Sequence, residues 1–238
     1  MRCLIYGKHS ATECLRNGNR KILKIWCVER FYFANQDLIS KFKFEIVSNA
    51  CLENLVGKAN HQGIVIEVPK NNDLVKEIAS HHRRVVILDS ITDPHNLGAI
   101  IRSAVAFGFD TVITGKTNSA GEGSVVARIS SGALEHVNLI KVVNISREIL
   151  NLKKQGFWIV GLDCNAENSI EHPLMNSDKI AIVLGSEGFG LRPLISKNCD
   201  ALVKIPMRNS EIASINVSNA AAIAFYFVSK KTNLPVQG

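Results

Sequence analysis

The strongest constraint on the fold is an alternation of short apolar runs with helix-like stretches that begins near residue 84. The apolar runs are rich in Val, Ile and Leu and are bounded by polar residues, which is typical of strands buried on both faces. Such strands, separated by helices, predict a mostly parallel sheet covered by helices on both sides. We expect these strands at Val85–Leu88, Thr111–Thr114, Leu139–Val143, Phe157–Leu162, Ile180–Leu184 and Leu202–Ile205.

The first part of the chain predicts a separate small α/β domain over residues 1–68. Strand-like runs occur at Ile22–Val28, Phe44–Val47 and Gln62–Val68. We expect Tyr6–Ser10 to be a loop in which Ser10 caps the following helix. Pro69 stops the last run and a polar turn cluster follows it, so we place a linker at 69–83 and a second domain at 84–238.

The positive charge of the chain is concentrated near its start. The formal net charge is +7, and the first 70 residues hold 11 of the 28 Lys and Arg residues but 6 of the 21 acidic residues. A basic region of this kind favours a polyanionic partner such as nucleic acid. A surface charge that only improves solubility is the alternative.

Membrane, secretion and metal signals are missing from the sequence. No apolar run approaches the roughly 20 residues that span a bilayer, and the first residues lack the apolar core of a signal peptide. We therefore expect a cytoplasmic protein with no membrane partner. The six cysteines form no Cys-x-x-Cys pair, so we expect no metal site and no disulfide framework.

The first polar segment, Asn96–Arg102, follows a predicted strand and Pro94, which interrupts the chain path, and we expect a helix to begin near Asn96. Leu97, Ile100 and neighbouring apolar residues form one helical stripe, while Arg102 falls outside it. We expect Asn96 to be the N-cap of this helix. Both polar residues would lie at the carboxyl edge of the sheet, where open α/β folds bind ligands. The alternative is a capping Asn and a solvent-exposed Arg.

The second segment, Gly185–Leu191, has three glycines in six residues directly after a predicted strand. Glycines permit tight turns and a close approach of the backbone to a ligand. The G-x-x-G-x-G spacing is neither the dinucleotide fingerprint nor the phosphate-binding loop. Glu187 inside the loop argues against a phosphate ligand, because its carboxylate would repel one. It would instead accept hydrogen bonds from an amine, a hydroxyl or an Arg. The alternative is an ordinary Gly-rich turn.

The third segment, Ile205–Ser218, begins where Pro206 stops a strand. Ser214, Asn216 and Ser218 then precede a predicted helix over Ala220–Val228. These side chains could cap that helix. They could equally orient a substrate at its N-terminus.

Taken in order, the three segments read Asn-Leu-Gly-x-x-x-Arg, Leu-Gly-x-Glu-Gly-x-Gly, and Ile-Pro-Met with Ser-x-Asn-Val-Ser. Over residues 84 to about 230 the chain thereby resembles the SpoU (TrmH-like) branch of the SPOUT methyltransferases. Ile5–His9 and His61–Ile64 resemble the substrate-binding extension of those members that modify a guanosine of 23S ribosomal RNA.

The resemblance implies a parallel sheet whose C-terminal part is threaded as a trefoil knot, and a homodimer. It implies S-adenosylmethionine as cofactor, held by Gly185, Ile205 and Ile215. It also implies methyl transfer to a ribose 2′-hydroxyl, with ribosomal RNA as partner.

The resemblance also suggests catalytic roles for five residues. Arg102 matches the essential Arg of the family, and because Arg hardly ever loses its proton we expect it to position the phosphate and the hydroxyl. Asn96 would hold the loop and Arg102, Glu187 would orient its neighbours, and Ser214 and Asn216 would complete the pocket.

Two alternatives stay open. One is a tRNA ribose 2′-O-methyltransferase of the TrmH type. The N-terminal extension favours ribosomal RNA over tRNA as the substrate. The other is a non-catalytic RNA-binding assembly factor on the same scaffold. A non-catalytic protein is expected to have lost the Arg at position 102 or the Glu at position 187. Both Arg102 and Glu187 are present, which argues against this second alternative.

Overall fold

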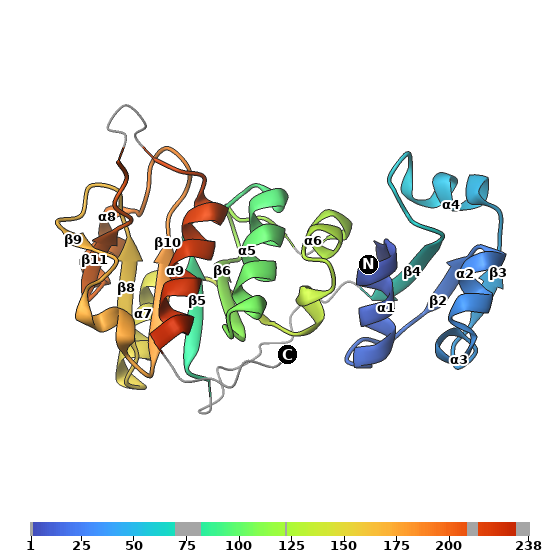
Figure 1. Cartoon of the computed structure of the whole chain (residues 1–238), viewed down its shortest axis with the longest axis horizontal. Coiled ribbons are helices and arrows are strands. Elements are labelled where there is room, and N and C mark those ends of the chain that lie inside the picture. Colours follow the sequence, from blue (N-terminus) through green and yellow to red (C-terminus); the bar gives the residue numbers. More distant parts are fainter. Residues whose placement is uncertain (1, 70–81, 122, 209–213, 232–238) are drawn as a thin grey trace. The chain divides into compact units, whose positions relative to one another are not determined.

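The computed structural model describes residues 2–69, 82–121, 123–208 and 214–231 of the chain. The chain divides into two compact units (Figure 1). Unit 1 comprises Met1–Leu74 and Gly121–His136, and unit 2 comprises Val75–Ala120 and Val137–Gly238. Most of the predicted linker lies at 70–81, outside the described residues.

Unit 1 is built on a four-stranded sheet with the order β1-β4-β2-β3. Strand β4 runs antiparallel to both β1 and β2, while β2 and β3 are parallel. Leu52 and the inward side chains of the central strands, such as Ile25 and Ile66, are fully buried. The strands are β1 (Arg2–Tyr6), β2 (Lys24–Cys27), β3 (Phe44–Ile46) and β4 (Ile64–Pro69), and the helices are α1 (Lys8–Asn17), α2 (Glu29–Ala34), α3 (Gln36–Ile39) and α4 (Asn49–Val56).

The expectation of a loop at Tyr6–Ser10 is wrong. Tyr6 ends strand β1, Gly7 makes the turn with φ of 93°, and helix α1 already begins at Lys8. Since glycine adopts positive φ without a Cβ clash, a single residue suffices to join strand and helix. Ser10 is therefore inside the helix, where its buried hydroxyl donates to the Ala127 carbonyl at 2.8 Å.

Unit 1 also includes a stretch from much later in the sequence. This stretch comprises helix α6 (Ser124–Ile129) and the short helix η1 (Ala133–Glu135). The Glu135 carbonyl accepts from Asn17 Nδ2, at the end of α1, at 2.8 Å. Arg20 Nε pairs with Glu135 Oε2 at 2.8 Å, with both side chains largely buried. Unit 1 is thus made from two separate stretches of chain, which the alternation of strands and helices does not reveal.

Unit 2 contains a seven-stranded sheet with the order β7-β6-β5-β10-β8-β11-β9, and its neighbouring strands are parallel. The predicted α/β class with a parallel sheet is confirmed, and the ends of the six predicted strands are each within one residue of the observed ends. The strands are β5 (Arg84–Leu88), β6 (Thr111–Gly115), β7 (Asn138–Val142), β8 (Trp158–Leu162), β9 (Asn168–Ser169), β10 (Ile180–Leu184) and β11 (Ala201–Lys204).

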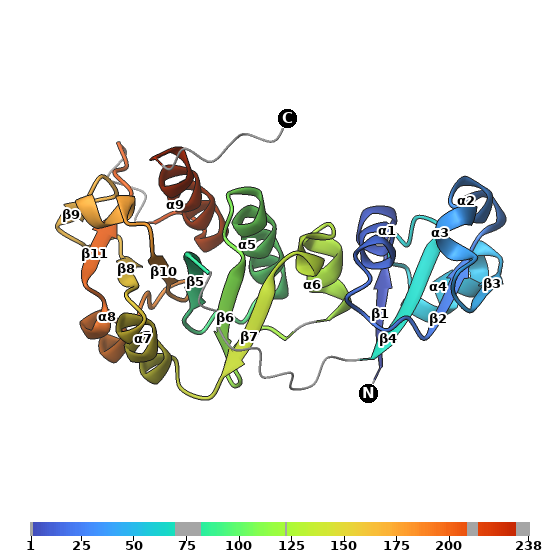
Figure 2. The same cartoon turned by 90° about the horizontal axis from the view of Figure 1, so that it is seen from below.

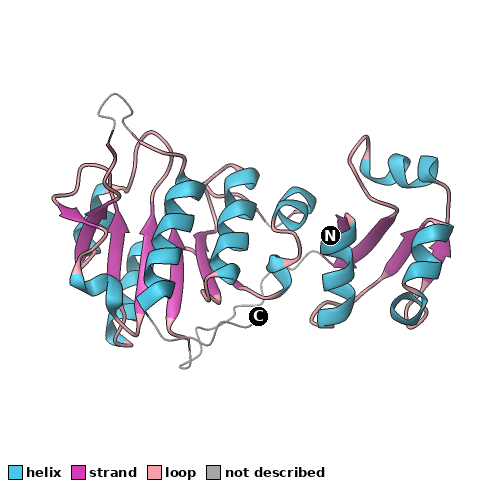
Figure 3. Cartoon of the chain, in the orientation of Figure 1, coloured by secondary structure: helices cyan, strands magenta, loops and turns pink. Residues whose placement is uncertain are grey.

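Helices cover both faces of this sheet (Figures 2 and 3). Helices α5 (Pro94–Ala106) and α9 (Val217–Lys231) pack together on one face, where the rings of Phe109 and Phe225 lie 4.4 Å apart. Helices α7 (Ile145–Lys154) and α8 (Pro193–Asn198) cover the other face, and η2 (Pro173–Asn176) joins β9 to β10. Strands β5 and β10 are fully buried at the centre. None of the helices, as far as they are described, has the length and apolarity to cross a membrane.

Candidate active site

A cavity of about 540 Å³ opens at the carboxyl edge of the sheet in unit 2. Strands β10, β8 and β11 end there, so the loops that follow them supply most of its wall. The volume lies within the ~300–1,000 Å³ that ligand sites usually have. Because carboxyl ends of parallel strands meet at one edge, segments far apart in sequence converge on this cavity.

The loop after β10 can form only because residue 185 is glycine. A Cβ on Gly185 would lie 2.2 Å from the Gly190 carbonyl carbon and 2.5 Å from the Leu191 nitrogen. The loop folds back on itself through Ser186, whose N–H donates to the Gly190 carbonyl at 3.1 Å and whose carbonyl accepts from the Gly190 N–H at 3.0 Å. This closed turn carries Glu187.

Glu187 is joined to two amide side chains from other elements. Its Oε1 accepts a hydrogen bond from Asn96 Nδ2 at 3.0 Å and another from Asn216 Nδ2 at 2.5 Å. Asn216 Nδ2 also lies 3.1 Å from Asn96 Oδ1. The three predicted polar segments therefore meet in one hydrogen-bonded group, which we call the Asn96–Glu187–Asn216 group.

Asn96 is not the N-cap of helix α5, which corrects the local prediction. Asp93 caps the helix by accepting from the His95 N–H at 2.9 Å, and Pro94 occupies the first turn. Pro suits that position because it has no N–H to satisfy there. Asn96 lies inside the helix, buried, and its amide remains available for Glu187.

Asn216 caps helix α9, which is one of the two roles that the sequence left open, and it also binds Glu187. Its Oδ1 accepts from the Ser218 N–H at 2.8 Å and from the Ser218 hydroxyl at 2.5 Å, which caps helix α9. Its Nδ2 binds Glu187 at the same time. Ser218 itself belongs to the helix, which begins at Val217 and not at Ala220.

Six of the eight residues singled out from the sequence line the cavity: Gly185, Glu187, Ile205, Ser214, Ile215 and Asn216. Asn96 does not line it but is bonded to two residues that do. Arg102 lies elsewhere, exposed on α5 and outside the cavity lining. Residues 209–213 of the third segment lie outside the described part of the chain.

The loop after β8 supplies three lining residues that were not predicted from the sequence. Asp163, Cys164 and Asn165 all line the cavity, and Asp163 Oδ1 accepts from the Asn165 N–H at 2.8 Å. Their position directly after a predicted strand was the available signal, since that edge of the sheet collects binding residues. With Glu187 they give the cavity two carboxylates.

The chemistry of the cavity suits a ligand that carries a positive charge, hydroxyls and an apolar part. Asp163 and Glu187 supply acceptor oxygens, while Leu184, Ile205 and Ile215 supply apolar walls. No group of three or more His, Cys, Asp or Glu residues within the described ranges is arranged to hold a metal ion.

Two family models match the chain. The model of the SpoU rRNA methylase family covers residues 83–226. A second model, described as RNA 2′-O ribose methyltransferase substrate binding, covers residues 4–74.

Among proteins of similar sequence, the 23S rRNA (guanosine-2′-O-)-methyltransferase RlmB of Coxiella burnetii is 40% identical over 97% of this chain and 96% of its own length. An uncharacterised tRNA/rRNA methyltransferase of Synechocystis is 36% identical over 96% of this chain, which spans 62% of that protein. The crystal structure of the SpoU methyltransferase AviRb from Streptomyces viridochromogenes, in complex with AdoMet, superposes with a TM-score of 0.81 at 20% identity. It covers 97% of this chain and 90% of AviRb, and at that identity it supports the fold alone.

Proposed function

Because the chain belongs to the SpoU rRNA methylase family, we propose that it transfers a methyl group from S-adenosylmethionine to a ribose 2′-hydroxyl of 23S ribosomal RNA, that of a guanosine. The observation that carries this proposal is the Asn96–Glu187–Asn216 group beside the cavity, because it joins the three segments on which the family resemblance depends. The full-length similarity to RlmB of Coxiella burnetii supports the guanosine of 23S rRNA as target.

The residues of the cavity fit S-adenosylmethionine. At Gly185 the loop is packed so tightly that no side chain would fit, which brings backbone amides and carbonyls to the cavity wall. Ile205 and Ile215 would flank the adenine ring, and the carboxylates of Asp163 and Glu187 suit the cationic and hydroxyl-bearing parts. When bound, this cofactor supplies a methyl group on a good leaving group.

Given such a donor, the protein must align the ribose hydroxyl with the methyl group, and the hydroxyl must lose one proton. Glu187, fixed by two amides, would orient the loop that contacts the cofactor. Ser214, exposed at the cavity, would hydrogen-bond the incoming ribose. Asn216 would keep the start of α9 in place while it holds Glu187.

Arg102 would act on the RNA and not on the cofactor. It is exposed on α5 and does not line the cavity, so it can meet a phosphate or hydroxyl of a substrate bound across the helix. A guanidinium remains protonated and binds phosphate oxygens with two parallel hydrogen bonds. Arg102 would therefore position the ribose–phosphate unit and stabilise developing negative charge.

We assign RNA binding to a substrate-binding domain at 1–68, joined by a linker at 69–83 to the methyltransferase domain at 84–238. The match to the substrate-binding model over residues 4–74 and the excess positive charge of this region support the assignment. This domain would anchor the RNA, while the methyltransferase domain would hold the cofactor and the reacting nucleotide.

The proposal includes a trefoil knot and a homodimer. The strand order supports the knot, because the chain leaves β10, makes the closed turn at Gly185–Leu191, and enters β11 on the far side of β8. Helix α9 supports the dimer, since Ile223 and Tyr226 are 41% and 52% exposed on it. Ribosomal RNA as substrate would place the enzyme in the cytoplasm.

A methyl-transfer assay tests the proposal. Purified protein is incubated with methyl-labelled S-adenosylmethionine and, in separate reactions, with unmodified 23S ribosomal RNA and bulk tRNA. We expect label in 23S RNA, resistant to alkaline cleavage at one guanosine because its 2′-hydroxyl is blocked. Label in tRNA alone would support the TrmH-type alternative, and no label in either RNA would support a non-catalytic assembly factor.

A further inference from the structure

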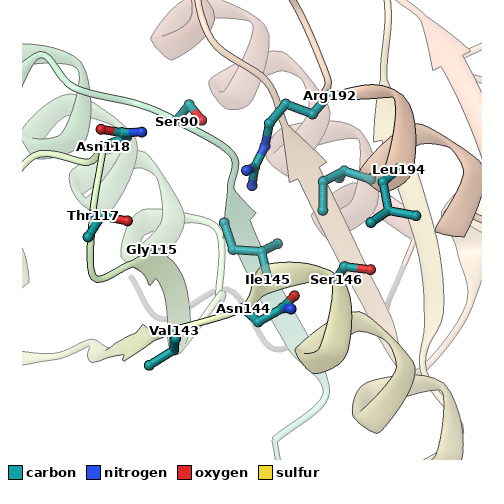
Figure 4. A pocket seen from close by; sticks show the side chains of 11 residues that line it. Ser90, Gly115, Thr117, Asn118, Val143, Asn144, Ile145, Ser146, Arg192 and Leu194 are labelled. Atoms are coloured by element: carbon teal, nitrogen blue, oxygen red, sulfur yellow. The ribbon is translucent and has the colours of Figure 1, made fainter.

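A second cavity, of about 270 Å³, lies at the carboxyl ends of β5, β6 and β7 in unit 2 (Figure 4). Ser90 follows β5, Gly115 ends β6 and Asn144 follows β7, while Arg192 and Leu194 close the opposite side. In contrast to the first cavity, no acidic side chain is among the described residues that line it. Nothing in the proposed methyl-transfer site uses this cavity.

The central group of the second cavity is a guanidinium held in one orientation. Asp89 Oδ1 accepts from Arg192 Nε at 2.7 Å and lies 2.6 Å from Nη2, while Asp89 Oδ2 accepts from the Arg192 backbone N–H at 3.0 Å. Asp89 is fully buried, whereas the Arg192 side chain is 59% exposed. The buried carboxylate thus fixes a planar group whose outer surface faces the cavity.

A fixed, flat guanidinium is a surface on which a nucleobase can stack. Because Asp89 already orders the Arg192 side chain, stacking would cost little additional side-chain entropy. The same ion pair offsets the positive charge of Arg192, which makes the site less suited to an isolated phosphate. The site therefore favours an aromatic ring over an anion.

The remaining walls fit a flat ring with a polar edge. Leu194, which is 60% exposed, and Ile145 line the cavity with aliphatic side chains. Thr117 and Asn118 lie across from Leu194, where their polar groups can meet the hydrogen-bonding edge of a base (Figure 4). An apolar wall with a few polar groups is the usual composition of a small-ligand site.

The backbone at this cavity is strained and fixed. Ser90 and Asn118 are two of the four non-glycine residues with positive φ among the described residues, at 63° and 53°. Such conformations persist only where surrounding contacts enforce them, and they concentrate at functional sites. Here the Ala120 N–H donates to the Ile91 carbonyl at 2.7 Å, which joins the two loops to each other.

We propose that this cavity binds one unstacked nucleobase of the RNA substrate, with its ring against the Arg192 guanidinium and the side chain of Leu194. Arg192 directly follows the closed turn at Gly185–Leu191, which lines the first cavity, so a base bound here holds the RNA strand beside the cofactor site. The inference rests on the proposed function in one respect, that RNA is the substrate.

Two variants with a matched control test the inference. Arg192→Lys keeps a cation for Asp89 but removes the planar surface, and Leu194→Ala removes the aliphatic wall. Leu150→Ala is the control, because Leu150 is 47% exposed on α7 and lines neither cavity. The Kd for 23S ribosomal RNA and for S-adenosylmethionine is measured for each, with thermal unfolding to verify the fold.

Loss of one stacked base corresponds to roughly a 5- to 150-fold weaker binding. We expect a rise of that order in the RNA Kd for Arg192→Lys and a several-fold rise for Leu194→Ala, with cofactor binding unchanged and the control equal to wild type. Cross-linking with 23S RNA that contains 4-thiouridine and 6-thioguanosine should label peptides that include Thr117–Asn118 or Arg192–Leu194.

Wild-type RNA affinity in both variants, or cross-links confined to other peptides, would overturn the inference. If the wild-type protein methylates RNA and the variants bind RNA normally, only the proposed nucleobase site is contradicted and the proposed function stands. If the wild-type protein neither binds nor methylates RNA, the proposed function fails with it.

Discussion

Asn96 donates a hydrogen bond to the carboxylate of Glu187 across 3.0 Å, although the two residues are 91 positions apart. The bond joins the first turns of helix α5 to the glycine turn that follows β10. Asn96 is buried and Glu187 lines the first cavity, so this bond connects the interior of the helix packing to the cavity wall.

Asn96→Ala should reduce both stability and activity. It removes one of the two amides that bind Glu187, and an under-satisfied polar group of this kind costs about 1–3 kcal/mol. We expect the free energy of unfolding, measured in urea, to fall by about that amount. Methyl transfer should fall as well.

Asn151→Ala provides the matched control, since Asn151 also donates to a carboxylate, Glu148 Oε2 at 3.2 Å, but within the single helix α7 and away from both cavities. Its unfolding free energy should change by less than about 0.5 kcal/mol. Equal effects of the two substitutions would show that the Asn96–Glu187–Asn216 group has no special role.

Gly185→Ala should abolish cofactor binding. The added Cβ would lie 2.2 Å from the carbonyl carbon of Gly190, so the turn that carries Glu187 must open. Calorimetric titration with S-adenosylmethionine should show no measurable binding. Gly121→Ala is the control, because a Cβ there has nothing within 4 Å, and normal binding by Gly185→Ala would contradict the assignment of the first cavity.

Arg102→Ala should separate binding from chemistry. Arg102 is exposed and outside the first cavity, so the Kd for S-adenosylmethionine should remain within about twofold of wild type. Loss of a group that stabilises developing charge lowers turnover by roughly 100-fold or more. Arg128→Ala, at an exposed Arg of α6, should retain activity, and unchanged turnover in Arg102→Ala would remove Arg102 from the mechanism.

The cysteines should differ sharply in reactivity. Burial raises the pKa of the Cys14 thiol to about 12 and that of Cys199 to about 12, so neither forms appreciable thiolate at pH 8. Cys164 is exposed and lines the first cavity. With iodoacetamide at pH 8, peptide mass spectrometry should find Cys164 alkylated and Cys14 and Cys199 unmodified.

S-adenosylmethionine should protect Cys164 from this alkylation, because it would occupy the cavity that Cys164 lines. Cys51, which is partly exposed in unit 1, gives the reference rate. Equal alkylation of Cys164 with and without saturating cofactor would place the cofactor elsewhere.

The parallel sheet was predictable because its strands are buried on both faces and therefore consist of unbroken apolar runs. Ile180–Leu184, for example, is observed with the bounds that the sequence predicts. Local polar contacts were less predictable. Asp93 competes with Asn96 for the cap of α5, and only the position of Pro94 in the first turn decides between them.

The site was predictable where glycine is required by sterics, as at Gly185, but not where residues act through tertiary contacts. The ion pair between Asp89 and Arg192 spans 103 positions and follows no local pattern. The same holds for Glu135, which pairs with Arg20 in unit 1 from a distance of 115 positions. Such pairs depend on which chain segments meet, and a periodicity of two or 3.6 residues does not contain that information.

In living cells this chain should methylate one ribose of ribosomal RNA. The most direct test is to map 2′-O-methylated nucleotides in ribosomal and transfer RNA from cells with and without the gene, and from cells that express only Arg102→Ala. We predict that one guanosine of 23S RNA loses its 2′-O-methyl group in the deletion strain, regains it with the wild-type gene and not with the variant. Identical methylation maps in all of these cells would show that the chain does not methylate these RNAs.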